Sequence, residues 1–189
     1  MPPEARRQQI LEAALTCFGE KGFHAATMDD LVRASGLSKG SLYWHFKSKD
    51  EVFLALFDAF SAELYGEWDD IAASTTDKLA VLHSEYESSL RRFAEERIIL
   101  LAWVEFLVHP VARERMRDSY STARDKVQSL IEAGRANGSI CEGPPADGVA
   151  STFVATLEGI FLQWLVDPDL DLEGHANISW QLLEKGLRP

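Results

Sequence analysis

Residues 39–49 combine side chains that could bind a phosphate backbone and read base edges. Lysine ammonium groups attract phosphates, serine and tyrosine hydroxyls are neutral hydrogen-bond donors, and a glycine lets a backbone approach a groove closely. The residues that we expect to contact DNA, including nearby helix caps, are Thr27, Ser38, Lys39, Gly40, Ser41, Tyr43, Trp44, His45 and Lys49. The set predicts recognition of double-stranded DNA.

Two short helices joined by a tight turn are predicted to position these side chains. Thr27 is a good N-cap and Asp30 can complete a capping box, so one helix is expected to begin there. Gly36 can adopt the left-handed conformation at its end, and Ser38 is a fresh N-cap. Helix, turn and helix then span about twenty residues, which is the size of a helix-turn-helix.

The residues after the turn fit the same motif. Leu42 and Phe46 lie four apart and are expected to face the core. Ser48 and Glu51 form a second capping box, so another helix is expected to follow at once. An amphipathic surface helix after a well-made turn would explain part of this pattern without any role in DNA binding.

A longer match favours the DNA-binding interpretation. Residues from Ile10 to Glu51 resemble the DNA-binding domain of the tetracycline-repressor (TetR) family of bacterial transcriptional regulators. The first helix ends in a Phe-x-x-x-Gly-Phe pattern at Phe18, Gly22 and Phe23, as in that family. The second short helix ends in Leu-Tyr-x-His-Phe followed by Ser-Lys, which is also typical of it.

The resemblance implies the fold class and the domains. We expect an all-α protein with an N-terminal three-helix helix-turn-helix DNA-binding domain over residues 1–50. A helical effector-binding and dimerisation domain is expected over residues 51–189. Helical periodicity and breaks predict the helices of this second part near 76–94, 97–108, 111–136, 147–166 and 173–187. A fourth helix is expected to run from the second capping box toward Trp68.

The charge is distributed unevenly along the chain. Residues 1–50 contain seven basic and six acidic residues, a net charge of +1, whereas the other 139 contain 12 and 24, a net charge of −12. Long-range attraction to DNA is therefore expected to be modest, with affinity resting on local contacts.

The last two expected helices have broad apolar faces that could complete a monomer's core. In the family that this chain resembles, the corresponding helices pair with their copies in a second subunit. A two-fold axis would also let two recognition helices read both halves of a palindromic operator. The residues assigned jointly to core and homodimer interface are Phe153, Leu157, Phe161, Trp164, Ile178, Leu182 and Leu183.

The middle helices are rich in aromatic residues, and two glutamates lie in apolar runs. Such aromatics are usually core residues, and such glutamates usually lie at a helix edge. The resemblance nevertheless implies a small-molecule effector, which would be bulky, apolar and, with a glutamate as anchor, cationic. The expected effector-binding residues are Trp68, Tyr86, Phe93, Trp103, Glu105, Phe106, Tyr120, Glu158 and Phe161.

Other function classes have less support in the sequence. The five histidines are dispersed, and no nucleophile elbow, P-loop or dinucleotide fingerprint occurs, so no enzyme activity, cofactor or metal is expected. Without an apolar signal segment, a cytoplasmic protein with no membrane partner is expected. A helical lipid carrier would explain the apolar body but not residues 39–49. A repressor is the preferred interpretation, and an activator or a co-repressor mechanism obeys the same physics.

Overall fold

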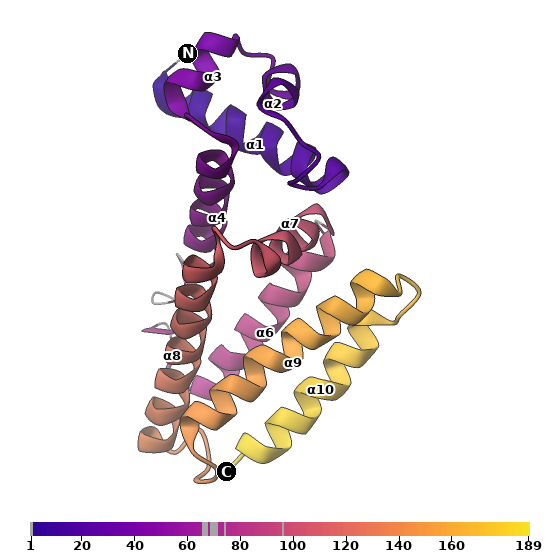
Figure 1. Ribbon diagram of the computed structural model, residues 1–189. Coiled ribbons are helices and arrows are strands. Elements are labelled where there is room, and N and C mark those ends of the chain that lie inside the picture. Colours follow the sequence, from indigo (N-terminus) through magenta and orange to yellow (C-terminus); the bar gives the residue numbers. More distant parts are fainter. Residues whose placement is uncertain (1, 66–67, 69–71, 74, 96) are drawn as a thin grey trace. The chain divides into compact units, whose positions relative to one another are not determined.

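The computed structural model describes residues 2–65, 68, 72, 73, 75–95 and 97–189, and within them it is built of helices and contains no strand (Figure 1). The all-α fold class is therefore confirmed. The helices are α1 (Pro3–Lys21), α2 (Met28–Ser35), α3 (Lys39–His45), α4 (Lys49–Tyr65), α6 (Lys78–Glu95), α7 (Arg97–Val108), α8 (Arg113–Asn137), α9 (Ala146–Val166) and α10 (Leu172–Leu187).

The helices end where the sequence signals predicted. The five expected ranges beyond residue 76 agree with α6 to α10 within two residues at each end. Gly138 follows α8 with a φ of 80°, a left-handed conformation that glycine adopts without steric cost. The predicted continuation of α4 toward Trp68 runs through residues 66 and 67, which lie outside the described residues.

The helices form two compact units. The first unit comprises Met1–Glu63 and Arg97–Met116, and the second comprises Leu64–Glu96 and Arg117–Pro189. Most of α4 and all of α7 thus pack in the same unit as α1, α2 and α3. The expected functional domains over 1–50 and 51–189 remain a proposal, and packing groups the helices differently.

An aromatic core holds the first unit together. The ring of Phe53 on α4 lies 4.4 Å from those of both Phe23 and Phe106, measured between centroids. Helix α7 also packs closely on α1, because a Cβ at Gly19 would clash with the side chain of Ile98. The contacts made by Phe23 and Gly19 therefore bring α1, α4 and α7 together.

A second aromatic cluster fills the other unit. Tyr86 on α6 is buried, and its ring centroid lies 5.6 Å from those of Phe153 on α9 and Trp180 on α10. Phe93 contacts Phe161 with a centroid separation of 4.7 Å. Helices α9 and α10 lie side by side along their length (Figure 1).

Helix α9 is unusually apolar for a helix with so much exposed surface. Among the described residues it is the one helix long and apolar enough to cross a membrane, although only 22% of the relevant window is buried. A helix covered by protein has the same length and composition, so this property does not by itself indicate a membrane span.

Candidate nucleic-acid interface

A complete capping box begins α2. Thr27 Oγ1 accepts a hydrogen bond from Asp30 N at 3.1 Å, and Asp30 Oδ2 accepts one from Thr27 N at 2.9 Å, as predicted. Asp30 is buried and also binds the side chains of Lys21 and Arg33. Hydrogen bonds from Lys21 and then Thr27 hold the pKa of Asp30 well below its usual range. One carboxylate thus connects the end of α1 to α2.

The turn between α2 and α3 also has the predicted form. Gly36 is left-handed, with a φ of 66°, and Ser38 Oγ caps α3 by accepting from Ser41 N at 3.2 Å. Leu42 and Phe46 are buried, which fixes the inner face of α3. The helix-turn-helix geometry is therefore dictated by local sequence signals and by two apolar contacts.

The outer face of α3 presents the polar and aromatic groups expected of a nucleic-acid reader. Trp44 is 67% exposed and Tyr43 is 36% exposed. The ring of His45 meets Trp44 edge-on at 4.5 Å. Gly40 is exposed, and a Cβ built there would meet no heavy atom within 4 Å. This surface can hydrogen-bond, stack and approach a groove closely.

The three lysines of this region have different partners. Lys39 Nζ lies 2.9 Å from Asp29 Oδ1, and both side chains are more than half exposed. The Asp29 carboxylate raises the pKa of Lys39 above its usual value. Lys47 Nζ donates to Tyr43 O at 2.8 Å. Lys49 Nζ instead donates to three carbonyl oxygens of the loop between α1 and α2.

The start of α4 departs slightly from its predicted capping box. Ser48 Oγ accepts from Glu51 N at 3.2 Å, as expected. The Glu51 carboxylate, however, accepts from Lys47 N at 2.6 Å, one residue earlier than in the standard box. Glu51 therefore closes the connection between α3 and α4.

Sequence reasoning missed several residues that shape this motif. Gln9 on α1 donates through Nε2 to Ser35 O at 2.7 Å and so satisfies a carbonyl at the end of α2. Asp29 was not singled out, although an acidic side chain across the turn from Lys39 is visible in the sequence. The contact of Gln9 has no comparable signal, since its partner lies 26 residues away.

The nine expected effector-binding residues do not form one group. Three of them, Trp103, Glu105 and Phe106, lie in the first unit. Trp103 and Phe106 pack on Phe57, with centroid separations of 6.0 and 5.0 Å. Glu105 faces the end of α1, since a Cβ at Gly22 would lie 3.2 Å from Glu105 Oε1.

The other six lie in the second unit and make separate contacts. Tyr86 donates to or accepts from the Ser179 hydroxyl, and burial raises its pKa. Tyr120 donates to the Glu158 carboxylate, which joins α8 to α9. Phe93 and Phe161 pack against each other, as described above, and Trp68 is buried.

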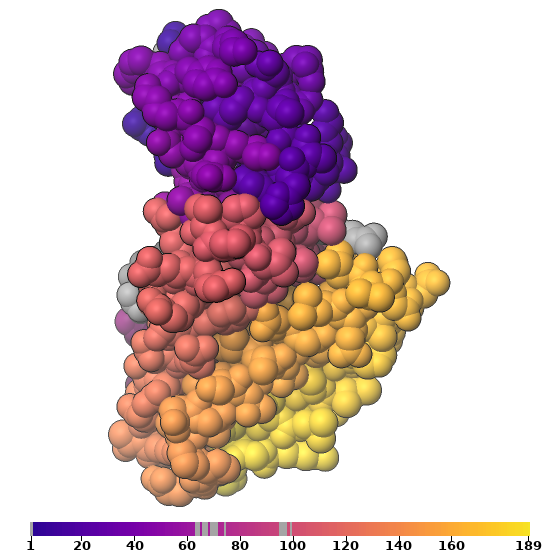
Figure 2. Space-filling model, in the orientation of Figure 1, coloured from indigo at the N-terminus to yellow at the C-terminus, as the bar shows by residue number. Residues whose placement is uncertain are grey.

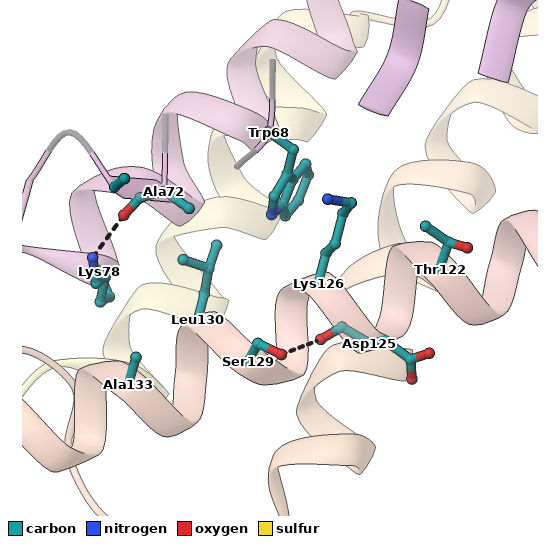
Figure 3. Close-up of a pocket in the computed structure, with 10 residues that line it drawn as sticks. Trp68, Ala72, Lys78, Thr122, Asp125, Lys126, Ser129, Leu130 and Ala133 are labelled. Atoms are coloured by element: carbon teal, nitrogen blue, oxygen red, sulfur yellow. Dashed lines mark hydrogen bonds between the residues drawn. The ribbon is translucent and has the colours of Figure 1, made fainter. Parts of the chain in front are cut away.

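A cavity of about 540 Å³ opens beside Trp68. Of the nine expected residues, Trp68 alone lines it, while Lys126 points toward the indole from α8 (Figure 3). Its apolar lining continues with Ala72, Ala73, Leu130 and Ala133. Its other polar lining residues are Lys78, Thr122, Asp125 and Ser129. The volume suits a drug-sized molecule.

The residues expected at a dimer interface divide into two groups. Phe153, Leu157 and Phe161 are buried within the unit and belong to its core. Ile178 and Leu182 are 59% and 66% exposed, whereas Trp164 and Leu183 are partly exposed. Two further exposed apolar residues of α9, Leu162 and Val166, were not predicted.

The exposed apolar residues belong to neighbouring helices. Leu162 and Val166 are on α9, and Ile178 and Leu182 are on α10. The surfaces of α9 and α10 form adjacent bands in the space-filling view (Figure 2). Exposed apolar residues that gather into one large patch mark a contact with another molecule, whereas residues that are scattered singly are normal on a protein surface.

Two family profiles match this sequence. The profile described as bacterial regulatory proteins, tetR family, matches residues 10–56. The profile described as BetI-type transcriptional repressor, C-terminal, matches residues 87–185. The first range includes α2, the turn and α3.

Individual proteins are also similar to this chain. The HTH-type transcriptional repressor KstR2 of Rhodococcus jostii is 31% identical over 137 residues, which cover 71% of this chain and 67% of that protein. The HTH-type transcriptional activator FasR of Mycolicibacterium smegmatis is 28% identical, over 95% of this chain and 84% of its own. The structure of FadR from Bacillus subtilis in complex with stearoyl-CoA has the same fold, with a TM-score of 0.84 and 18% identity. The match covers 95% of this chain and 98% of the FadR chain.

Proposed function

We propose that this chain, which belongs to the TetR family of bacterial regulatory proteins, represses transcription from a palindromic operator until a bulky apolar effector binds. It is a DNA-binding transcriptional regulator. Dimerisation, operator symmetry, effector class and a cytoplasmic, non-catalytic role are parts of the proposal.

The observation that carries the proposal is the outer face of α3. This short helix is capped at its start and packs on the core through buried Leu42. Its opposite side, with Tyr43 and Trp44, is exposed to solvent. A recognition helix in the major groove requires this division. Ser41 and Lys39 lie in its first turn, where we expect contacts with base edges, and we expect the exposed Tyr43 to contact a phosphate.

The exposed apolar residues of α9 and α10 support a homodimer. Leaving Val166 85% exposed and Leu182 66% exposed is unfavourable in water, and a second copy of the same surface would cover both. Two copies of α3 related by a two-fold axis would then read two half-sites about one helical turn apart.

The cavity beside Trp68 supports effector binding. Its wall includes Trp68, three alanines and Leu130, and Lys126 points its ammonium toward the indole, whereas the Asp125 carboxylate is turned away from it (Figure 3). The second ammonium of the wall, that of Lys78, donates to Ala72 O and Thr75 O. An effector that binds one arrangement of the two DNA-binding heads better than the other would shift the population away from the DNA-fitting form. The stearoyl-CoA bound by FadR illustrates a ligand with a long apolar chain, here attached to a polar, anionic group, in a protein of this fold.

Selection from a random duplex library tests the DNA-binding part of the proposal. Purified protein should enrich a palindrome whose half-sites are separated by about one helical turn, or roughly 10 base pairs. Enrichment of single, unpaired half-sites would contradict the dimeric operator. No enrichment at all would contradict sequence-specific binding.

Tryptophan fluorescence tests the effector site. Wild type should bind a cationic dye or a fatty acyl compound. The charge of the ligand that binds more tightly should decide which substitution weakens its binding. An acyl carboxylate should bind about tenfold more weakly, or 1.4 kcal/mol, to Lys126→Met than to wild type. Asp125→Asn, which changes a carboxylate that is turned away from the indole, is the matched control. If Glu158→Gln alone weakens binding of the dye, the Glu158 carboxylate is the anchor instead. Unchanged binding in all three variants would place the effector elsewhere.

The direction of regulation needs a separate measurement, because FasR is named an activator. A reporter fused to the selected operator should be more active in cells without this protein. Lower activity in those cells would identify an activator or a co-repressor mechanism.

A further inference from the structure

The ammonium group of Lys49 is enclosed by the loop that joins α1 to α2. Lys49 Nζ donates to Phe23 O at 2.6 Å, to Ala26 O at 2.8 Å and to His24 O at 3.3 Å. It also lies 4.3 Å from the centroid of the Phe23 ring. We propose that Lys49 is a positioning residue that fastens this loop and so orients α2 and α3, and that it does not bind a DNA phosphate. The proposal rests on the DNA-binding function proposed above and revises the role expected for Lys49 from the sequence.

The number of donors supports this role. A lysine ammonium has three N–H groups and no acceptor, and here three carbonyl oxygens are within hydrogen-bond distance. The face of Phe23 adds a cation–π attraction on the same ammonium. A phosphate could therefore be bound only by breaking contacts that already satisfy the charge.

The loop needs such a partner. Phe23 and Ala26 are buried, and a buried carbonyl without a hydrogen-bond donor costs free energy. Gly22 starts the loop with a φ of 76°, and Ala26 N donates back to Gly22 O at 3.2 Å. The carbonyls of residues 23, 24 and 26 converge on one point, where a single ammonium binds all three.

The consequence for the motif follows from what adjoins the loop. Thr27, the N-cap of α2, comes directly after Ala26, and Lys49 is the first residue of α4. The Lys49 contacts therefore connect the start of the helix-turn-helix to the helix that follows it. Loss of these contacts would free the N-terminus of α2 while leaving the outer face of α3 chemically unchanged.

The other two lysines of the region provide a contrast. Lys39 Nζ pairs with one carboxylate and lies 5.9 Å from the centroid of the Tyr43 ring. Lys47 Nζ donates to one carbonyl, and both lysine side chains are exposed. Each can exchange its partner for a phosphate at little cost. Lys39→Met is therefore the matched control for Lys49→Met, since both variants keep an unbranched apolar side chain and lose one charge.

The salt dependence of operator binding separates the two roles. Removing a lysine that neutralises a phosphate lowers the slope of log K against log salt by about 0.9, whereas removing a positioning lysine does not. We expect Lys49→Met to bind operator at least about tenfold more weakly with an unchanged slope, and Lys39→Met to show the reduced slope. A slope reduced by about 0.9 in Lys49→Met would overturn the proposal.

An arginine at this position gives an independent test. Arg keeps the charge, but its planar fork cannot place donors on three converging carbonyls as an ammonium does. We expect Lys49→Arg to remain weaker than wild type by several-fold. Wild-type affinity in Lys49→Arg would indicate that the charge alone matters, and would overturn the proposal.

Hydrogen exchange tests the positioning role without DNA. The amide protons of residues 22–30 should exchange faster in Lys49→Met and Lys49→Arg than in wild type. In Lys39→Met they should exchange at the wild-type rate. Unaltered exchange in both Lys49 variants would overturn the proposal. If wild type binds no DNA but the exchange pattern is as expected, the function has failed and the positioning role has not. Failure of Lys49→Met to fold would support the positioning role. The salt dependence of operator binding would then be measured with Lys49→Arg.

Discussion

Lys39 Nζ on α3 lies 2.9 Å from Asp29 Oδ1 on α2, so a basic group that we expect to contact DNA is paired with an acid across the turn. Both side chains are more than 60% exposed, and an exposed pair of this kind contributes little to stability. Its consequence concerns binding, because Lys39 must leave Asp29 before it can contact DNA, and Asp29 repels any phosphate that approaches.

Asp29→Asn should therefore strengthen DNA binding. The energy of an exposed ion pair corresponds to about a twofold to fivefold change in affinity, and the gain should appear on operator and random DNA alike. Binding isotherms on both duplexes would measure it. Weaker operator binding in Asp29→Asn would instead make Asp29 a recognition residue.

Asp30 should make the stability of the helix-turn-helix depend on acid. Its pKa is held well below the ordinary value of about 3.9, so its contribution is fully present above about pH 4 and is lost as the pH falls through the folded-state pKa. Asp30→Asn should be less stable than wild type at pH 7, with a difference that shrinks below about pH 4. Urea unfolding at several pH values measures this difference. If the free energies of unfolding of wild type and Asp30→Asn differ by the same amount at every pH, ionisation of Asp30 does not cause the pH dependence.

The proposed dimer should be disrupted by charges on α10. Ile178→Glu with Leu182→Glu places two carboxylates on exposed apolar positions and should give monomers that bind operator poorly. The control Ser121→Glu with Ala136→Glu adds the same charge to exposed positions of α8. Sedimentation of both would decide, and a dimer in the first variant would move the interface away from α10.

The close packing of α1 on α7 predicts that alanine in place of Gly19 lowers the stability of the protein. Gly19→Ala should destabilise the protein by about 1–3 kcal/mol, because the new methyl group collides with Ile98, even though alanine favours helices. Gly148→Ala, where a Cβ meets no heavy atom within 4 Å, should instead stabilise by about 0.5 kcal/mol. Thermal unfolding measures both. Equal effects at the two sites would show that Gly19 is not packed as described.

Local signals explain why the DNA-binding motif could be predicted from the sequence. The caps at Thr27 and Ser38 and the left-handed Gly36 act within four residues of themselves, so their roles can be read from the local sequence without knowledge of the tertiary structure. The helix ends at Pro110 and Gly138 are local for the same reason.

Contacts between distant segments explain what could not be predicted. Trp68 and Trp103 are both buried, but they pack in different units, and periodicity does not identify the packing partner. The carbonyls that bind Lys49 lie 23 to 26 residues earlier in the chain. Helix α9 has apolar residues on several sides, so its sequence did not distinguish buried Phe161 from exposed Val166.

The central claim is that this chain binds a specific DNA sequence as a dimer. Fluorescence anisotropy should be measured with the selected palindrome and with a shuffled duplex of the same composition, at one physiological salt concentration. We expect saturation at two protomers per palindrome, with an affinity at least about a thousandfold higher than for the shuffled duplex. Equal affinity for the two duplexes would contradict it.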